Sequence, residues 1–135
     1  MKVSEYMTRD VVTANLEDGL RQTFYRMRER DIHHMPVVGD RNEIVGIISD
    51  RDLRRPDWVD DEENVAHYYL LDNDHKVSDT MTQAPAVVAP EDDIQKAVEL
   101  LLSKRIGAVP VVAADGCLAG ILSAVDMLRA FHERG

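Results

Sequence analysis

The chain has 135 residues, of which 44% are hydrophobic and 5% aromatic, so it is long enough for a compact domain with an aliphatic core. Its formal net charge of −9 argues against binding to nucleic acid or to an anionic membrane, because both require a basic face. Cys117 is the only cysteine, which excludes a disulfide within the chain and favours a reducing compartment. No apolar run reaches transmembrane length, and the N-terminus lacks the apolar core of a signal peptide, so we expect a cytoplasmic protein.

The first half of the sequence returns in the second half at an offset of 74 residues. Met7-Thr8, for example, recurs as Met81-Thr82, and the offset continues without a gap. Sixteen of the fifty-four positions in residues 2–55 are identical to their counterparts in residues 76–129, whereas unrelated stretches share roughly one position in fifteen. The predicted organisation is repeat 1 at residues 1–55, a connector at residues 56–75 and repeat 2 at residues 76–135.

Each repeat predicts the same elements in the same order: strand, helix, strand, strand, helix. An acidic turn precedes the first helix, whose apolar residues Leu20, Phe24 and Met27 lie at helical spacing. The predicted strands are at residues 11–14, 35–38 and 44–48 in repeat 1, and at residues 86–89, 109–112 and 118–122 in repeat 2. One copy of about fifty residues would bury too little surface alone. We therefore expect an α/β fold in which two β-α-β-β-α repeats pack through their sheets with pseudo-two-fold symmetry.

The connector between the repeats differs from both in composition. It is strongly acidic, and Asp60-Asp61-Glu62-Glu63 has the character of a helix start. Val65 and Tyr69 then supply a modest apolar face. We expect a connecting segment with one short helix.

The most informative stretch, residues 44–53, reads as a buried strand that runs directly into a helix. Ser49 is a suitable N-cap for that helix, and Asp52 follows three residues later. The same pattern returns at residues 118–127, with Ser123 and Asp126. A glycine inside each strand marks a place where a ligand or another backbone approaches closely. Two such stretches in matching positions indicate a duplicated unit with a shared purpose.

These motifs, taken in order, resemble a tandem pair of cystathionine β-synthase (CBS) domains, or Bateman module. The pattern consists of Met-Thr, a Val-rich strand, Ile-x-x-x-Pro-Val-Val and Gly-Ile-[IL]-Ser-x-x-Asp, and it occurs in both repeats. The run His67-Tyr68-Tyr69-Leu70-Leu71 in the connector is similar to stand-alone bacterial CBS pairs, including those linked to acetoin utilisation. The resemblance covers nearly the whole chain except the connector.

The resemblance implies a regulatory module that binds AMP, ADP, ATP or S-adenosylmethionine in two clefts between the repeats and requires no other cofactor. It also implies a homodimer and an unidentified effector protein that responds to the ligand. Asp52 and Asp126 are expected to bind the ribose hydroxyls, while Ser49 and Ser123 face phosphate or ribose. The remaining residues that the resemblance assigns to the clefts lie on the strands around them: Thr13, His34, Met35, Pro36, Gly46, Ile47, Val87, Ala108, Val109, Pro110, Gly120 and Ile121.

The Ser-x-x-Asp motifs also have a purely structural interpretation. In a capping box, the serine caps the helix and the acid reaches back to the serine N–H, and spacing alone favours this interpretation. A carboxylate at the same place can accept hydrogen bonds from a ribose diol, and a helix N-terminus suits phosphate. The two roles are compatible, so both stay open.

The repeats differ in charge beside the two motifs. Arg51 and Arg54 of repeat 1 correspond to Val125 and Leu128 of repeat 2, whereas Arg55 and Arg129 agree. We therefore expect the first cleft to favour phosphates, with Arg51 as a ligand contact. The second cleft is expected to bind a less charged ligand or none.

Other functional classes find less support in the sequence. The five histidines and Cys117 lack the spacing of metal ligands, and His34 is better explained as a base-edge contact or as a polar residue near the cleft. No catalytic residue is expected, because neither Ser49 nor Ser123 has a base or a Gly-x-Ser-x-Gly turn beside it. A structural module with degenerate clefts and, less favoured, a small nucleotide hydrolase remain as alternatives.

Overall fold

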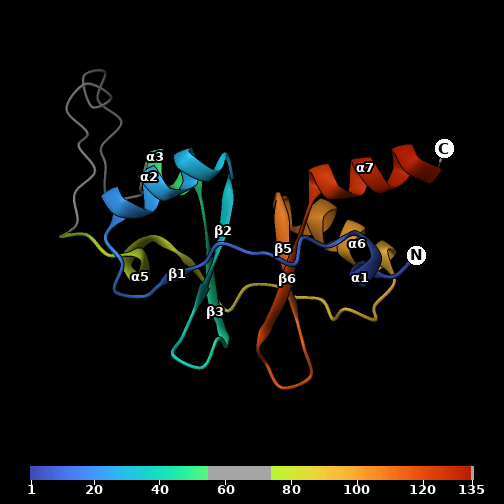
Figure 1. Cartoon of the computed structure of the whole chain (residues 1–135), viewed down its shortest axis with the longest axis horizontal. Coiled ribbons are helices and arrows are strands. Elements are labelled where there is room, and N and C mark those ends of the chain that lie inside the picture. Colours follow the sequence, from blue (N-terminus) through green and yellow to red (C-terminus); the bar gives the residue numbers. More distant parts are fainter. Residues whose placement is uncertain (55–73, 135) are drawn as a thin grey trace.

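The computed structural model describes residues 1–54 and 74–134 and shows two α/β halves side by side (Figure 1). Repeat 1 contains α1 (Val3–Tyr6), β1 (Ala14–Asn15), α2 (Leu20–Arg30), β2 (His34–Val38), β3 (Ile44–Ser49) and α3 (Asp50–Arg54). Repeat 2 contains α5 (Val77–Thr80), β4 (Thr82–Gln83), α6 (Ile94–Lys104), β5 (Ala108–Val112), β6 (Leu118–Ser123) and α7 (Ala124–Arg134). The α/β class and the two-repeat architecture predicted from the sequence are confirmed.

The long helices α2 and α6 show why matching sequences give matching elements. Each has eleven residues and buries its first, fourth and eighth positions, which is the spacing of one helical face. Each ends at a residue in the left-handed region, Asp31 with φ 52° and Arg105 with φ 54°, after which the chain enters β2 or β5. The helices therefore cover one side of each half and deliver the chain to the same end of both hairpins.

The two β-hairpins form the centre of the molecule (Figure 1). In repeat 1 the sheet order is β1-β2-β3-β4, with β1 parallel to β2 and the other pairs antiparallel. In repeat 2, β5 and β6 form the antiparallel equivalent of β2 and β3. The register shifts at the same place in both hairpins, between Val37 and Val38 and between Val111 and Val112.

The turns of the two hairpins bind each other through a symmetric pair of backbone hydrogen bonds. The N–H of Ile44 donates to the carbonyl of Gly116 over 3.4 Å, and the N–H of Leu118 donates to the carbonyl of Asn42 over 2.9 Å. These bonds are related by the repeat offset of 74 residues. They agree with the pseudo-two-fold relation between the halves.

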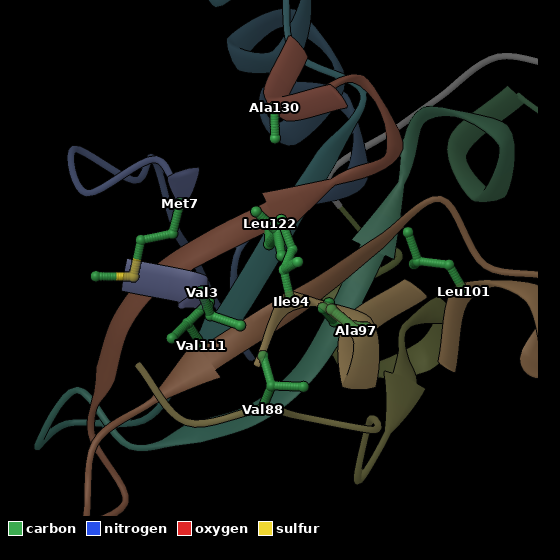
Figure 2. Packing of buried hydrophobic residues seen from close by; sticks show 10 residues of the cluster. Val3, Met7, Val88, Ile94, Ala97, Leu101, Val111, Leu122 and Ala130 are labelled. Carbon is green, nitrogen blue, oxygen red and sulfur yellow. The ribbon is translucent and has the colours of Figure 1, made fainter. Parts of the chain in front are cut away.

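Each repeat packs its first residues into the core of the other repeat, so the two repeats exchange these segments. Val3 and Met7 belong to the buried cluster of repeat 2, together with Val88, Ile94 and Leu122 (Figure 2). In the reciprocal contact, Val77 is buried in the cluster of repeat 1 and Met81 packs against it. Thr8 bridges β6 at Ile121, and Thr82 pairs with β3 at Ile47. Neither core is complete without a segment from the other repeat.

The sequence did not predict every element. The four-residue helices α1 and α5 were missed, because they are too short to show helical periodicity. The first strand of each repeat is shorter than predicted: repeat 1 has only β1, and in repeat 2 Val88 forms an isolated bridge to Val111. Side chains end the pairing here, since Asp18 accepts the N–H of Asn15 and Asp92 accepts the N–H of Ala89. The predicted helix and most of the connector lie outside the described residues, so the division into repeats and connector at residues 56–75 stays a prediction.

Candidate functional site: a cleft between the repeats

A cavity of about 890 Å³ lies between the two repeats and contains Asp52; we call it the Asp52 cleft. Repeat 1 contributes the start of β2, part of β3 and the first turn of α3. Repeat 2 contributes the segment after α5 and the end of α6. The lining residues are His34, Ile47 and residues 49–52 from repeat 1, and Thr82, residues 84–86 and residues 104–108 from repeat 2.

Asp52 forms the predicted capping box with Ser49, yet this leaves polar atoms available. The backbone N–H of Ser49 donates to Oδ2 of Asp52 over 2.9 Å, and the N–H of Asp52 donates to Oγ of Ser49 over 3.2 Å. Within the described part of the chain, Oδ1 of Asp52 and the hydroxyl proton of Ser49 have no partner. The cap thus fixes an acceptor and a donor on the cleft wall.

Asp126 forms the same cap but is more fully engaged. Its Oδ2 accepts hydrogen bonds from both the N–H of Ser123 (2.9 Å) and the Oγ of Ser123 (3.0 Å). Its Oδ1 faces Nη1 of Arg129 at 3.5 Å, and the residue is only 6% exposed. A ribose at Asp126 would have to displace existing contacts, whereas one at Asp52 would not.

Three cations line the Asp52 cleft: Arg51 from α3, and Lys104 and Arg105 from the end of α6. All three are exposed, and none forms an ion pair within the described residues. Their counterparts in repeat order are Val125, Arg30 and Asp31. The positive charge is therefore concentrated on one side of the pseudo-symmetry. Of the two arginines by which the repeats differ in sequence, only Arg51 is among the lining residues, and Lys104 and Arg105 add to it.

His34 lines the Asp52 cleft at a place where the two repeats are in close contact. A side chain at residue 107 would place its Cβ 2.6 Å from Nε2 of His34, so a residue larger than glycine there would make the His34 ring shift. Burial lowers the pKa of His34 below its ordinary value, and the charges of Asp50 and Asp52 only partly oppose that effect. The ring is therefore neutral at pH 7.

The structure brings some of the predicted ligand residues together and not others. His34, Ile47, Ser49, Arg51, Asp52 and Ala108 line the Asp52 cleft. Met35, Pro36, Val109 and Pro110 are buried in the sheets, and Thr13 and Val87 lie beside the first strand positions; none of these is among the lining residues. Ile121, Ser123 and Asp126 occupy the equivalent positions in repeat 2 and do not line the cleft either. Ligand contact for all of these residues stays a prediction.

The two strand glycines have a packing role in this structure. A Cβ at Gly46 would lie 2.9 Å from the carbonyl oxygen of Thr82, and a Cβ at Gly120 would lie 2.7 Å from that of Thr8. The close approach predicted at these glycines is therefore made by the backbone of the exchanged segment.

Sequence reasoning missed the part of the cleft that comes from repeat 2. These residues are Thr82, residues 84–86 and residues 104–107. Ala84 among them has a φ of 46°, which is uncommon for a residue other than glycine. No local signal identifies this wall, because it depends on the exchange of segments and on how the repeats pack.

The described residues show neither a metal site nor a membrane span. Within residues 1–54 and 74–134, no group of three or more His, Cys, Asp or Glu side chains is arranged to hold a metal ion. In the same part of the chain, every helix is too short or too polar to cross a membrane.

Comparison with known proteins identifies the family. The CBS domain model matches residues 3–56 and 77–133, and the chain belongs to the CBS domain family. A CBS domain-containing protein of Dictyostelium discoideum is 30% identical over 130 residues, covering 93% of this chain and 88% of that protein. The chain spans much less of longer relatives, for example 23% of an inosine-5'-monophosphate dehydrogenase of Korarchaeum cryptofilum.

Solved structures agree with this assignment. CBSX2 of Arabidopsis thaliana is 29% identical with a TM-score of 0.82, and the match covers 98% of this chain and 94% of that one. CBSX2 has also been solved in complex with AMP, and that structure has a TM-score of 0.81 at 28% identity, with 98% and 96% coverage. The putative acetoin utilisation protein AcuB of Vibrio cholerae is 26% identical with a TM-score of 0.78, at 98% and 91% coverage. The resemblance stated from the motifs is confirmed.

Proposed function

We propose that this protein is a regulatory module that binds an adenine nucleotide in the Asp52 cleft. One observation carries the proposal: an available carboxylate oxygen of Asp52 lies in the same cleft as three cations that have no ion-pair partner in the described residues. A volume of about 890 Å³ is within the range of small-molecule sites. The similarity to CBSX2, which has been solved with AMP, supports the same ligand class.

In the proposed complex, the ribose hydroxyls donate to Oδ1 of Asp52. The phosphates face Arg51, Lys104 and Arg105, and the base packs against the apolar wall at Ile47. S-adenosylmethionine, which carries a sulfonium cation in place of phosphates, fits this charge pattern less well than AMP, ADP or ATP. Because the ligand would contact both repeats, its binding favours one relative arrangement of the repeats, which a partner protein can then recognise.

A thermal-shift titration with adenosine, AMP, ATP and S-adenosylmethionine tests this function. A ligand that binds only the folded state raises the melting temperature, with about 2.7 kcal/mol of added stability at a hundred times its Kd. We expect AMP and ATP to stabilise the wild type and Asp126→Asn, and to lose most of that effect in Asp52→Asn. Equal losses in both variants would contradict the asymmetry, and no shift with any ligand would favour the structural alternative. Release of ADP from ATP during incubation would favour the hydrolase.

The proposed module also forms a homodimer in the cytoplasm. The outer faces of α6 and α7 carry Leu102, Val125, Leu128 and Phe131, which are 60% to 77% exposed. Exposed apolar side chains that gather on one face are typical of an interaction surface. Light scattering of Phe131→Glu should show a shift toward monomer. Tyr25→Glu, which changes an exposed aromatic residue on α2 of repeat 1, is the matched control and should leave the mass unchanged.

A further inference from the structure

The position of His34 gives the Asp52 cleft a group whose charge can change near neutral pH. His34 is half-buried at the start of β2, and it lines the same cavity as the three cations. Its ring packs against Gly107 of the other repeat, and it has no hydrogen-bond partner within the described residues. Its counterpart in repeat 2 is Ala108, so the strand position that pairs with Ser123 has no imidazole, whereas the one that pairs with Ser49 does.

Charged and titratable groups reach His34 from every element around it. Asp50, Arg51 and Asp52 approach from α3, His33 precedes it on its own strand, and Lys104 and Arg105 close the cavity from the end of α6. His33 is itself held by Asp50, whose Oδ2 lies 3.0 Å from Nδ1 of His33. Among the protein's own groups, desolvation dominates this balance and the pKa of His34 is lowered.

A bound phosphate changes the balance. It brings negative charge into a cavity where the cations now pair with the ligand instead of repelling a protonated imidazole. An opposite charge within about 4–6 Å favours the charged form of a histidine. A neutral adenosine brings no such charge and leaves the ring as it is.

We propose that His34 takes up a proton from solvent when a phosphate-bearing adenine nucleotide binds in the Asp52 cleft, so that the affinity for nucleotide rises as the pH falls. This inference rests on the proposed function, since it concerns the regulation of that same site. It makes the module respond to pH as well as to nucleotide. A rise of one unit in the pKa of His34 on binding corresponds to about a tenfold change in affinity across the titration.

Isothermal titration calorimetry tests this directly. AMP, ATP and adenosine are titrated at pH 6.5 in two buffers that differ in ionisation enthalpy, which gives the number of protons taken up. Wild type is compared with His34→Gln, and the matched control is His33→Gln. The protonation of the nucleotide itself is common to all variants and cancels in the comparison. Wild type and His33→Gln should take up more protons with nucleotide than His34→Gln does, and adenosine should show no such difference.

A second variant covers the case in which His34→Gln does not fold. His34→Arg is permanently charged, so it should bind AMP and ATP without the additional proton uptake and should retain high affinity at pH 8. Nucleotide binding with the same proton uptake in wild type and His34→Gln would overturn this inference alone. If none of the three compounds bound wild type at any pH, the proposed function would fail together with the inference.

Discussion

Ser49 and Ser123 begin the same turn in the two repeats, and Asp52 and Asp126 close the same capping box. The two carboxylates nevertheless have different neighbours. Asp52 lines a cavity of about 890 Å³ and has a carboxylate oxygen without a partner in the described residues. Asp126 is 6% exposed, with hydrogen bonds from Ser123 and a contact to Arg129. A motif that is identical in the sequence can therefore serve a ligand in one repeat and stabilise a helix in the other.

The surroundings of the motif explain the difference better than the motif does. The Asp52 cleft has three cations and two carboxylates among its charged lining residues. At the positions related to this lining by the repeat offset of 74 residues, the sequence has one cation, Arg30, and three carboxylates, Asp10, Asp31 and Asp126. Charge of this kind selects phosphate through its sign and position. Four changes that treat the repeats as a matched pair test how far the difference extends.

The largest change in stability is expected in the exchanged segments at the start of each repeat, where the two repeats are equivalent. Val3 and Val77 are both fully buried, each in the core of the other repeat. Val3→Ala and Val77→Ala should each lower the free energy of unfolding by about 2–3 kcal/mol, from lost burial and the cavity left behind. Hydrogen exchange should accelerate first in repeat 2 for Val3→Ala and first in repeat 1 for Val77→Ala. If hydrogen exchange became faster only in the repeat that carries the substitution, the packing of each segment in the core of the other repeat would be contradicted.

The strand glycines should show a slightly smaller effect. In Gly46→Ala the new Cβ would meet the backbone oxygen of Thr82, and in Gly120→Ala it would meet that of Thr8. Backbone cannot move aside as a side-chain tip can, so we expect a loss of about 1–2 kcal/mol for each variant in urea unfolding. Adding Met81→Ala to Gly46→Ala relieves only the contact with the sulfur atom and should restore little. A loss of nucleotide binding with unchanged stability would instead support the ligand contact predicted from the sequence.

The sequence predicted the features that depend on residues close together in the chain. The caps at Ser49 and Ser123 and the apolar faces of α2 and α6 are of this kind, and the repeat offset of 74 residues is visible in the sequence itself. The sequence did not predict features that depend on residues far apart in the chain. Nothing near Thr82 or Lys104 indicates that these residues complete a cleft built around Asp52. Gly46 and Gly120 illustrate both outcomes. The sequence correctly predicted that something approaches them closely, but which group does so depends on the segments that the two repeats exchange.

The cations of the Asp52 cleft provide the third test. Arg51→Val copies the residue of repeat 2 and should weaken ATP binding about fivefold, or about 1 kcal/mol, because the site is exposed and screened by solvent. Adenosine should bind Arg51→Val and wild type equally in calorimetry. The reverse change, Val125→Arg, should create no second nucleotide site while the oxygens of Asp126 are engaged. An equal loss for adenosine would show that Arg51 acts through the fold and not through phosphate.

The smallest effect concerns Ala84, on the cleft wall contributed by repeat 2. Its φ of 46° costs an ordinary residue about 1–2 kcal/mol, and its counterpart Asp10 has no positive φ. Ala84→Gly removes that strain but adds about 0.5–1 kcal/mol of chain entropy to the unfolded state, so a net gain of about 0.5 kcal/mol is expected. Asp10→Gly has only the entropic cost and should lower the melting temperature in the same buffer. If both variants lowered the melting temperature equally, the backbone at Ala84 would not be strained. If Ala84→Gly raised the melting temperature, the backbone at Ala84 would be strained. This strain would lie next to Thr82, which both lines the cleft and pairs with Ile47.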